Sequence, residues 1–203
     1  SSPPAWRTLG RDAQPPAIST PASQPPNRVV WQMPVDLQPQ YTGNGALLVH
    51  YGSPVITQAN TVIVPVKTGA TGGFRVEARA GSSGALQWSM STGYILPAAS
   101  WVPAYGPALT SQSRVYFPGA GGRVYFREQP DAATGASGQV IFYGLANYQA
   151  NPQAYDANVI INTPLTTDPS GNLYFGFVVT GSTPLGLTSG IALPRPALPP
   201  APM

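Results

Sequence analysis

Residues 129–142 read QPDAATGASGQVIF, a run of small and turn-forming residues followed by β-branched and aromatic ones. The segment RVYFREQ at 123–129 comes directly before it, so a turn lies between two apolar runs. Asp131 can hydrogen-bond the turn backbone, and Gly135 or Gly138 can adopt the positive φ that a chain reversal needs. The stretch therefore predicts a β-hairpin of two short antiparallel strands.

The surroundings of this hairpin repeat along the chain. Three segments begin alike, namely SPVIT at 53–57, GPALT at 106–110 and TPLTT at 163–167. An apolar run follows each segment, and these runs begin at Val62, Val115 and Leu173. The first two units add a third run, at 74–80 and 123–129, and a fourth, at 85–90 and 139–144. Four short strands separated by glycine-rich turns predict an antiparallel meander.

The third unit is shorter than the other two. GIAL at 190–193 can form its third strand, but no fourth apolar run follows before the proline-rich end. Asp168, in the sequence DPSGN at 168–172, is expected to stabilise the turn between the first two strands of this unit. Because a calcium loop would require more than one carboxylate, we interpret both Asp131 and Asp168 as turn residues.

The composition favours an all-β protein. The chain of 203 residues contains 22 glycines and 25 prolines, a content that favours short elements joined by turns and opposes long helices. Lysine and glutamate, which form helices readily, are represented only by Lys67, Glu77 and Glu128. The length is sufficient for one good core or two small ones.

The distribution of charge argues against nucleic acid as a partner. The net charge is +3, but residues 29–193 contain six positive and six negative side chains, so the excess lies at the ends. A neutral body lacks the basic surface of a nucleic-acid-binding protein. Charged residues make up only 8% of the chain, and we expect an extracytoplasmic location for so weakly charged a β protein. Without cysteine there is no disulfide or thiolate metal site, and no apolar run is long enough for a transmembrane helix.

The two ends of the chain are rich in proline. Residues 1–28 contain seven prolines and few large apolar groups, so we expect an extended arm. Residues 194–203 contain five prolines and are typical of polyproline II structure. The β domain is expected to occupy residues 29–193. The two ends are either linkers or segments that lie along the surface of a partner.

The first unit resembles the blade repeat of pyrroloquinoline-quinone-type β-propellers. The resemblance rests on Ser-Pro-Val at 53–55, on AGSSGALQW at 80–88 and on the turn DAATG at 131–135. Trp88 stands where the closing tryptophan of that repeat would fall, and Trp31 resembles the same fourth-strand position of a preceding, incomplete unit. In the second unit, Phe142 is expected to take the place of this tryptophan.

The resemblance implies about three propeller-like blades of four antiparallel strands in an incomplete ring. A β-sandwich is the alternative fold. Closed propellers typically have four to eight blades, so we expect other protein chains, or self-association, to complete the ring or sheet. Enzymes of this family bind the quinone and a calcium ion. No residue here matches their sites, so we predict no cofactor, no metal and no catalytic residue.

Aromatic residues in the two links between units are candidates for a binding surface. These are Tyr94, Trp101, Tyr105, Tyr143, Tyr148 and Tyr155. Tyrosine and tryptophan combine a rigid contact area with a polar tip, which suits sugar or protein contacts. Packing of the links onto neighbouring units is the alternative interpretation.

Other candidates for chemistry are weak. His50 is the only histidine, so it cannot form a metal site or triad with a second one. Glu77 and Glu128 are expected at matching positions of two units, each beside arginine, which favours cross-strand ion pairs over catalysis.

These observations favour a non-catalytic structural or binding protein that acts as part of a larger extracytoplasmic assembly. Two alternatives stay open. The chain could be a fragment or subunit of a quinone-dependent dehydrogenase, or it could be a carbohydrate-binding module that uses the link aromatics for glycan.

Overall fold

The computed structural model describes residues 5–8, 10–11, 25–39, 41, 43–45, 52–69, 73–95 and 105–194. Within this part of the chain, twelve strands form three antiparallel sheets, and only two short α-helices are present. The prediction of an all-β fold built from four-stranded antiparallel sheets is therefore confirmed.

The first two sheets are the predicted meanders. The first sheet consists of β1 (Val55–Ile56), β2 (Thr61–Lys67), β3 (Phe74–Ala80) and β4 (Leu86–Ser91), paired in chain order. The second sheet consists of β5 (Ala108–Leu109), β6 (Arg114–Pro118), β7 (Arg123–Glu128) and β8 (Ser137–Ile141), again in chain order. A short 3-10 helix, η1 (Ala120–Gly122), connects β6 to β7.

The third sheet has four strands but is only three strands wide. It contains β9 (Val159–Ile161), β10 (Thr166–Thr167), β11 (Leu173–Val179) and β12 (Gly190–Ala192). Both β9 and β10 pair with the same edge of β11, while β12 pairs with the other edge. No strand among the described residues pairs with the outer edge of β12.

The turn between the first and second strands has one design in all three sheets. Thr57, Thr110 and Asp168 each accept, through the side-chain oxygen, a hydrogen bond from the backbone N–H four residues further on. The third residue after each of them has a positive φ, of 66° at Asn60, 60° at Ser113 and 83° at Gly171. This shared geometry fixes which residues of the three sheets are equivalent, and it confirms that Asp168 stabilises a turn.

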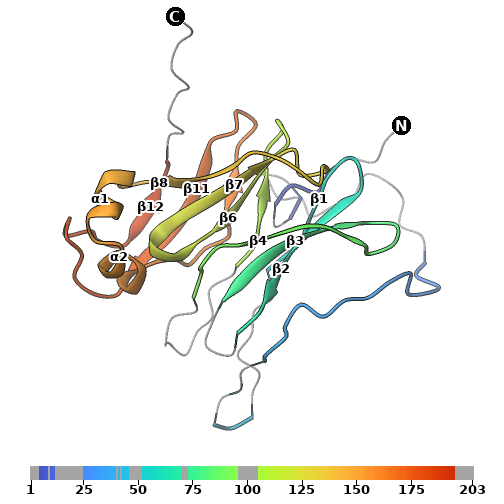
Figure 1. Cartoon of the computed structure of the whole chain (residues 1–203), viewed down its shortest axis with the longest axis horizontal. Helices are drawn as coiled ribbons and strands as arrows, with labels where there is room; N and C mark the ends of the chain where they lie inside the picture. Colours follow the sequence, from blue (N-terminus) through green and yellow to red (C-terminus); the bar gives the residue numbers. More distant parts are fainter. Residues whose placement is uncertain are drawn as a thin grey trace, which may run out of the picture.

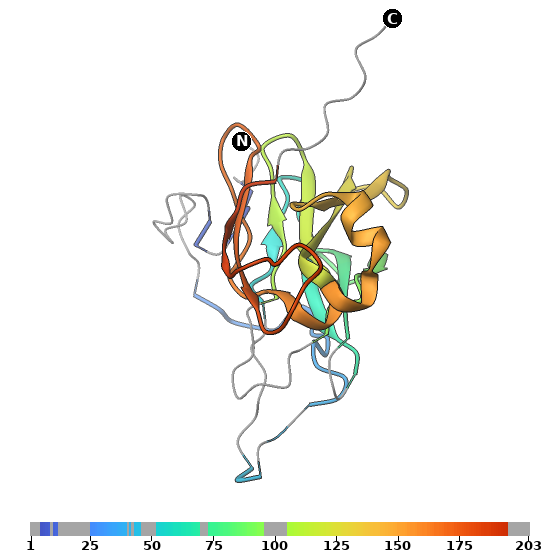
Figure 2. The same ribbon diagram turned by 90° about the vertical axis from the view of Figure 1, so that its left-hand side faces the viewer.

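The three sheets stack face to face in chain order. Figure 1 shows them side by side, and Figure 2 turns the end with the third sheet and the helices toward the viewer. Leu109, Val115 and Phe117 of the second sheet pack against the first sheet, and Tyr116 and Val124 pack on the opposite side against the third. The middle sheet is thus buried on both faces, unlike either layer of the two-sheet sandwich that the sequence left as an alternative.

The short first strands of the sheets lie close together. The hydroxyl of Thr167 in β10 donates to the carbonyl of Leu109 in β5, at 3.2 Å. The N–H of Leu109 donates to the carbonyl of Arg7, at 2.7 Å, and Trp6 forms an antiparallel bridge with Ile56 of β1. The described part of the N-terminal segment therefore lies between β1 and β5.

The link between the second and third sheets contains the two helices, which the sequence analysis did not predict. α1 (Leu145–Ala150) and α2 (Pro152–Asn158) follow one another with a single residue between them. The side chain of Asn151 accepts a hydrogen bond from the N–H of Ala154 and caps α2, and Pro152 occupies the first helical turn, where its missing N–H costs little.

The hairpin of residues 129–142 is present, but its aspartate has a different role from the one expected. Asp131 accepts a hydrogen bond from the hydroxyl of Thr57 in the first sheet, at 2.5 Å. The guanidinium of Arg127 holds the turn instead, by donating to the carbonyls of Ala132 and Ala133 at 3.0 Å. The turn therefore connects two sheets as well as two strands.

Candidate protein interaction site

Equivalent positions of the three sheets can be compared one by one. The residue six positions after the turn residue is Ile63, Tyr116 or Tyr174. Ile63 is opposite Ala78 and Tyr116 is opposite Phe126, and the register of β11 with β12, continued one residue past the end of β12, brings Leu193 to the same position beside Tyr174. Two positions further along the second strand, the third-strand partners are Val76, Val124 and Ile191. All nine side chains are apolar or aromatic, and they lie on the face of each sheet that points toward the next sheet in the stack, which we call the trailing face.

The trailing faces of the first two sheets are covered by the sheets that follow them. Ile63, Val76 and Ala78 are fully buried in the layer between the first and second sheets. Tyr116 and Val124 are buried between the second and third sheets, where the half-buried Phe126 also packs. These contacts are made by the same strand positions in both layers, so one packing arrangement is repeated.

The trailing face of the third sheet is exposed. Ile191 is 83% exposed, Leu193 46% and Tyr174 37%. The three residues are equivalent to positions that are buried in the other sheets, and they are of the same apolar kind. Residues that would suit burial against another sheet are therefore left in contact with water.

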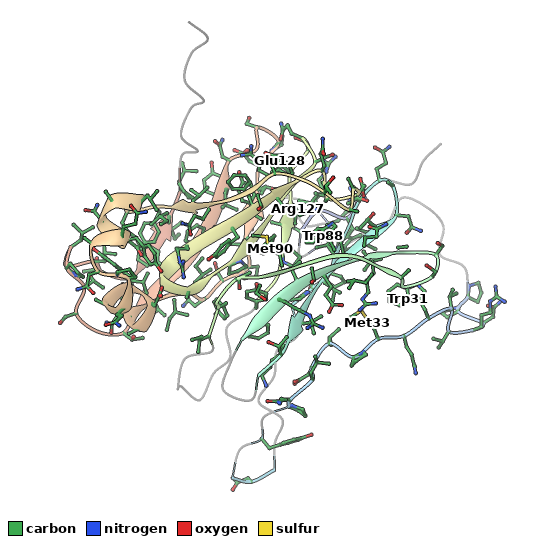
Figure 3. The ribbon with its side chains drawn as sticks, in the orientation of Figure 1. Trp31, Met33, Trp88, Met90, Arg127 and Glu128 are labelled. Atoms are coloured by element: carbon green, nitrogen blue, oxygen red, sulfur yellow. The ribbon has the colours of Figure 1, made fainter. Side chains whose placement is uncertain are left out.

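Two tryptophans make a matching contact with the sheet that follows them. The indole N–H of Trp88 in β4 donates to the carbonyl of Pro130 in the second sheet, at 2.8 Å. The indole N–H of Trp31 donates to the carbonyl of Gly81 in the first sheet, also at 2.8 Å. Figure 3 shows both tryptophans, each with a methionine two residues further on, Met33 or Met90. The pattern Trp-x-Met at 31–33 and 88–90 is a sequence signal of this equivalence that the sequence analysis did not use.

Phe142 does not occupy the place of this tryptophan in the second sheet. Ala78 is opposite Trp88, and the equivalent of Ala78 is Phe126, which lies opposite Gly138. The ring of Phe126 fills the space over Gly138, because a Cβ there would approach it to 2.7 Å. Phe142 lies beyond the end of β8 and packs against Phe177 of β11, with ring centroids 4.4 Å apart.

The five described tyrosines of the proposed binding surface are buried. Tyr94, Tyr105 and Tyr155 are at most 1% exposed, and Tyr143 and Tyr148 are below 10%. They pack the sheets together and do not present an exposed surface, so the sequence-based proposal for these five residues is corrected. The sixth candidate, Trp101, and the single histidine, His50, lie outside the described residues.

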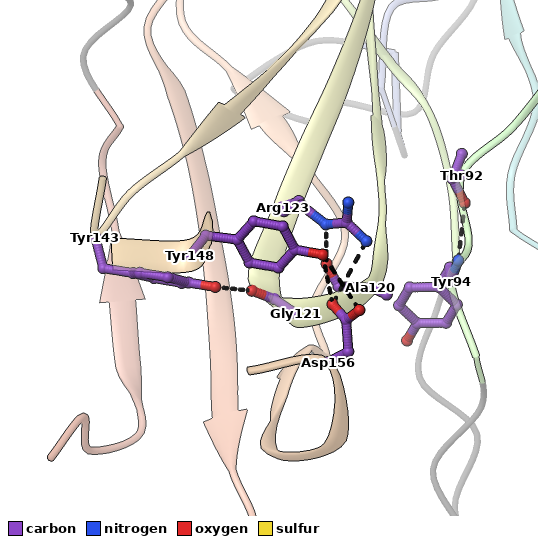
Figure 4. Close-up of polar contacts among 8 residues, drawn as sticks. All are labelled: Thr92, Tyr94, Ala120, Gly121, Arg123, Tyr143, Tyr148 and Asp156. Carbon is purple, nitrogen blue, oxygen red and sulfur yellow. Dashed lines mark hydrogen bonds and ion pairs between the residues drawn. The ribbon is translucent and has the colours of Figure 1, made fainter. Parts of the chain in front are cut away.

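Four of these tyrosines use their hydroxyls in hydrogen bonds within the chain, whereas the buried hydroxyl of Tyr155 has no partner among the described residues. Tyr94 donates to the carbonyl of Ile161 at 2.9 Å, which connects the first link to the third sheet. Tyr143 donates to the carbonyl of Gly121 at 2.6 Å (Figure 4). Burial raises the pKa of Tyr94, Tyr105 and Tyr143 far above the usual value of a phenol. Their hydroxyls therefore stay protonated at neutral pH.

A small polar cluster fixes the helical link to the second sheet. Arg123 donates to the carbonyl of Ala120 at 2.8 Å and reaches Asp156 of α2 at 3.4 Å (Figure 4). The hydroxyl of Tyr148 in α1 lies 3.2 Å from both carboxylate oxygens of Asp156, and the Arg123 guanidinium lies over its ring at 4.4 Å. The cluster joins α1 and α2 to the start of β7 and to the connection between β6 and β7.

Glu77 and Glu128 do not occupy matching positions, contrary to the sequence analysis. The register places Glu77 opposite Val64 in the middle of the sheet and Glu128 opposite Arg114 at the end of β6. Glu128 forms the predicted cross-strand ion pair with Arg114. Glu77 is buried and pairs with Arg75 and Arg79 of its own strand, at 2.6 Å each. Both carboxylates are occupied by arginine.

Two polar pockets lie between neighbouring hairpin turns. One, of about 380 Å³, is lined by Arg7, Thr57 and Asp131, and the other, of about 310 Å³, by Arg114 and Glu128. Each contains a guanidinium and a carboxylate, and both carboxylates already have a partner within the chain, Arg114 for Glu128 and Thr57 for Asp131.

The described residues contain no group of three or more histidine, cysteine, aspartate or glutamate side chains placed to hold a metal ion. None of the helices they form is both long and apolar enough to span a membrane.

Comparison with known proteins gives no assignment. No model of a known protein family matches the sequence, and no curated protein matches it either.

Proposed function

We propose that this chain is a non-catalytic structural or binding protein with a propeller-like arrangement of sheets, acting as part of a larger assembly outside the cytoplasm. The arrangement is supported by three successive antiparallel sheets whose short first strands lie together. It is also supported by the packing of each sheet on the next. Between the first two sheets, Trp88 of the fourth strand donates a hydrogen bond to Pro130 of the following sheet.

The observation that carries the proposal is the exposure of the third trailing face. Ile191, Leu193 and Tyr174 repeat the apolar character of positions that are buried twice within the chain. Burying one isoleucine side chain contributes about 1.5–3 kcal/mol. The exposed apolar face of the third sheet would therefore gain stability if a sheet of another chain packed against it.

Substitution of Ile191 tests this function. Ile191→Asp is expected to weaken association of the chain by at least about tenfold, because a carboxylate cannot be buried against an apolar sheet without a partner. Ile95→Asp is the matched control, since Ile95 is 62% exposed but lies outside the third sheet. Sedimentation velocity over a concentration series measures both. Equal association of the two variants and the unmodified chain would contradict the proposal.

A further inference from the structure

Residues 28–33 repeat the fourth strand of the first sheet. Their sequence, RVVWQM, corresponds position by position to ALQWSM at 85–90, which forms most of β4. Trp31 donates to the turn of the first sheet as Trp88 donates to the turn of the second. In its sequence and its tryptophan contact, this segment therefore resembles the fourth strand of a sheet that would precede the first sheet.

The backbone of the same segment has no strand partner. No described hydrogen bond involves a backbone N–H or C=O of residues 28–33, and these residues pair with none of the described strands. Val29 and Val30 are 76% and 67% exposed. An extended segment with free backbone groups and exposed β-branched side chains is a template for pairing with a sheet edge.

The segment is held in place from its C-terminal side. Lys67 at the end of β2 forms a bridge with Asp36, and its buried ammonium donates to the carbonyl of Gln38, at 2.5 Å. The Asp36 carboxylate lies 3.7 Å from the same ammonium. The segment is thus fixed against the first sheet at Trp31 and again at residues 36–38, so little ordering is needed before its residues pair with another strand.

The third sheet offers the complementary site. In the first two sheets, β4 and β8 cover the outer edge of the third strand, whereas the outer edge of β12 is open among the described residues. The open edge adjoins the exposed trailing face of Ile191 and Leu193. One end of the molecule therefore carries a fourth strand without a sheet, and the other end carries a sheet without a fourth strand.

We propose that residues 28–33 of one copy pair with β12 of a second copy and serve as the fourth strand of its third sheet. The inference rests on the proposed function and names the partner as a second copy of this chain. The pairing of β3 with β4 gives the register, in which Gln32 lies opposite Ala192 and Met33 opposite Ile191. If the exchange is reciprocal, two copies bring six sheets together, a number within the range of closed propellers.

Cysteine cross-linking tests the register directly, because the chain contains no cysteine of its own. The variants Gln32→Cys and Ala192→Cys are mixed and oxidised, and non-reducing electrophoresis detects a disulfide-linked dimer. Residues directly opposite on antiparallel strands have Cα atoms about 4.5–5.5 Å apart, within the range of a disulfide. Only pairs that contain one chain of each variant can form this disulfide, so equal amounts that pair at random are expected to give a cross-linked dimer in roughly half of the pairs.

The control pairs Gln32→Cys with Thr188→Cys. Thr188 lies four residues before Ala192 and outside β12, so in this register it is not opposite Gln32 and should not form the disulfide. If the chain associates but both pairs cross-link equally, or not at all, the inference is overturned and the proposed function stands. A chain that is monomeric and forms no cross-link overturns both. A disulfide within one chain, formed by the double variant Gln32→Cys/Ala192→Cys, also overturns the inference.

Discussion

At the scale of single residues, Trp88 shows how one side chain can connect two sheets. It is 7% exposed, donates its N–H to the carbonyl of Pro130, and lies under the guanidinium of Arg127 at 4.5 Å from the ring centroid. The same guanidinium holds the turn that follows β7. One indole thus orders the packing between sheets and the hairpin of the next sheet.

The variant Trp88→Phe tests the weight of this contact. It keeps most of the ring but leaves the Pro130 carbonyl without its donor, so we expect the free energy of unfolding to fall by about 1–3 kcal/mol. Trp31→Phe is the control, and a smaller loss is expected because Trp31 is only half-buried. Denaturant unfolding of both variants measures the difference. A Trp88→Phe variant as stable as the unmodified chain would show that the hydrogen bond contributes nothing.

The buried tyrosines make stability sensitive to alkali. Their folded-state pKa lies above that of an unfolded tyrosine, about 10, so the native protein keeps phenolic protons that the unfolded chain loses. The contribution of these tyrosines to the free energy of unfolding is therefore fully present below about pH 10. As the pH rises further, the free energy of unfolding falls by about 1.4 kcal/mol per pH unit for each such tyrosine.

This dependence can be measured by denaturant unfolding at a series of pH values from 9 to 12. Tyr143→Phe removes one ionising hydroxyl, so its stability is expected to fall less steeply with pH than that of the unmodified chain. Phenolate absorbance of the unmodified chain should appear together with unfolding. Full ionisation of Tyr94, Tyr105 and Tyr143 in a protein that remains folded would contradict this account.

At the scale of elements, the repeated first turn explains why the sequence predicted the strands well. Short apolar runs in a repeated unit, separated by turn residues, indicated eleven of the twelve strands, because local turn chemistry decides where each begins. β9 and the two helices were missed. They lie in a link whose structure depends on packing against η1 and β11, which the local sequence does not encode.

The candidate site was less predictable for the same reason. Tyr94 and Tyr143 have the composition of a binding surface, and only the stacking of the sheets determines that they are buried. Conversely, nothing in the local sequence distinguishes Ile191 from Val76 or Val124. Its exposure follows from its position in the last sheet of the described stack.

The turns provide a matched pair of variants at this scale. Thr57 and Thr110 cap equivalent turns and are similarly buried, but only Thr57 also donates to Asp131 of the next sheet. Thr57→Val should therefore cost about 1.5–3 kcal/mol more than Thr110→Val, the usual contribution of a hydrogen bond to a charged group. Thermal or denaturant unfolding measures both. Equal losses would show that the contact between the sheets does not add to stability.

At the scale of the whole molecule, the stack has two unlike ends. The first end carries residues 28–33 as a strand without partners, and the last end carries the exposed face of Ile191 beside the open edge of β12. A contact between unlike ends is heterologous, and it closes into a ring only if the rotation between copies permits. If the rotation does not permit closure, the same contact adds copies into an open filament. The size of the assembly therefore shows whether the contact between copies closes into a ring.

The most direct test of this account is the mass of the purified chain in solution, measured by light scattering over a range of concentrations. Reciprocal strand exchange in a closed pair predicts twice the chain mass of 21.2 kDa, and Ile191→Asp should return it toward a single chain. A folded protein with the mass of one chain at every concentration up to its solubility limit would contradict the account.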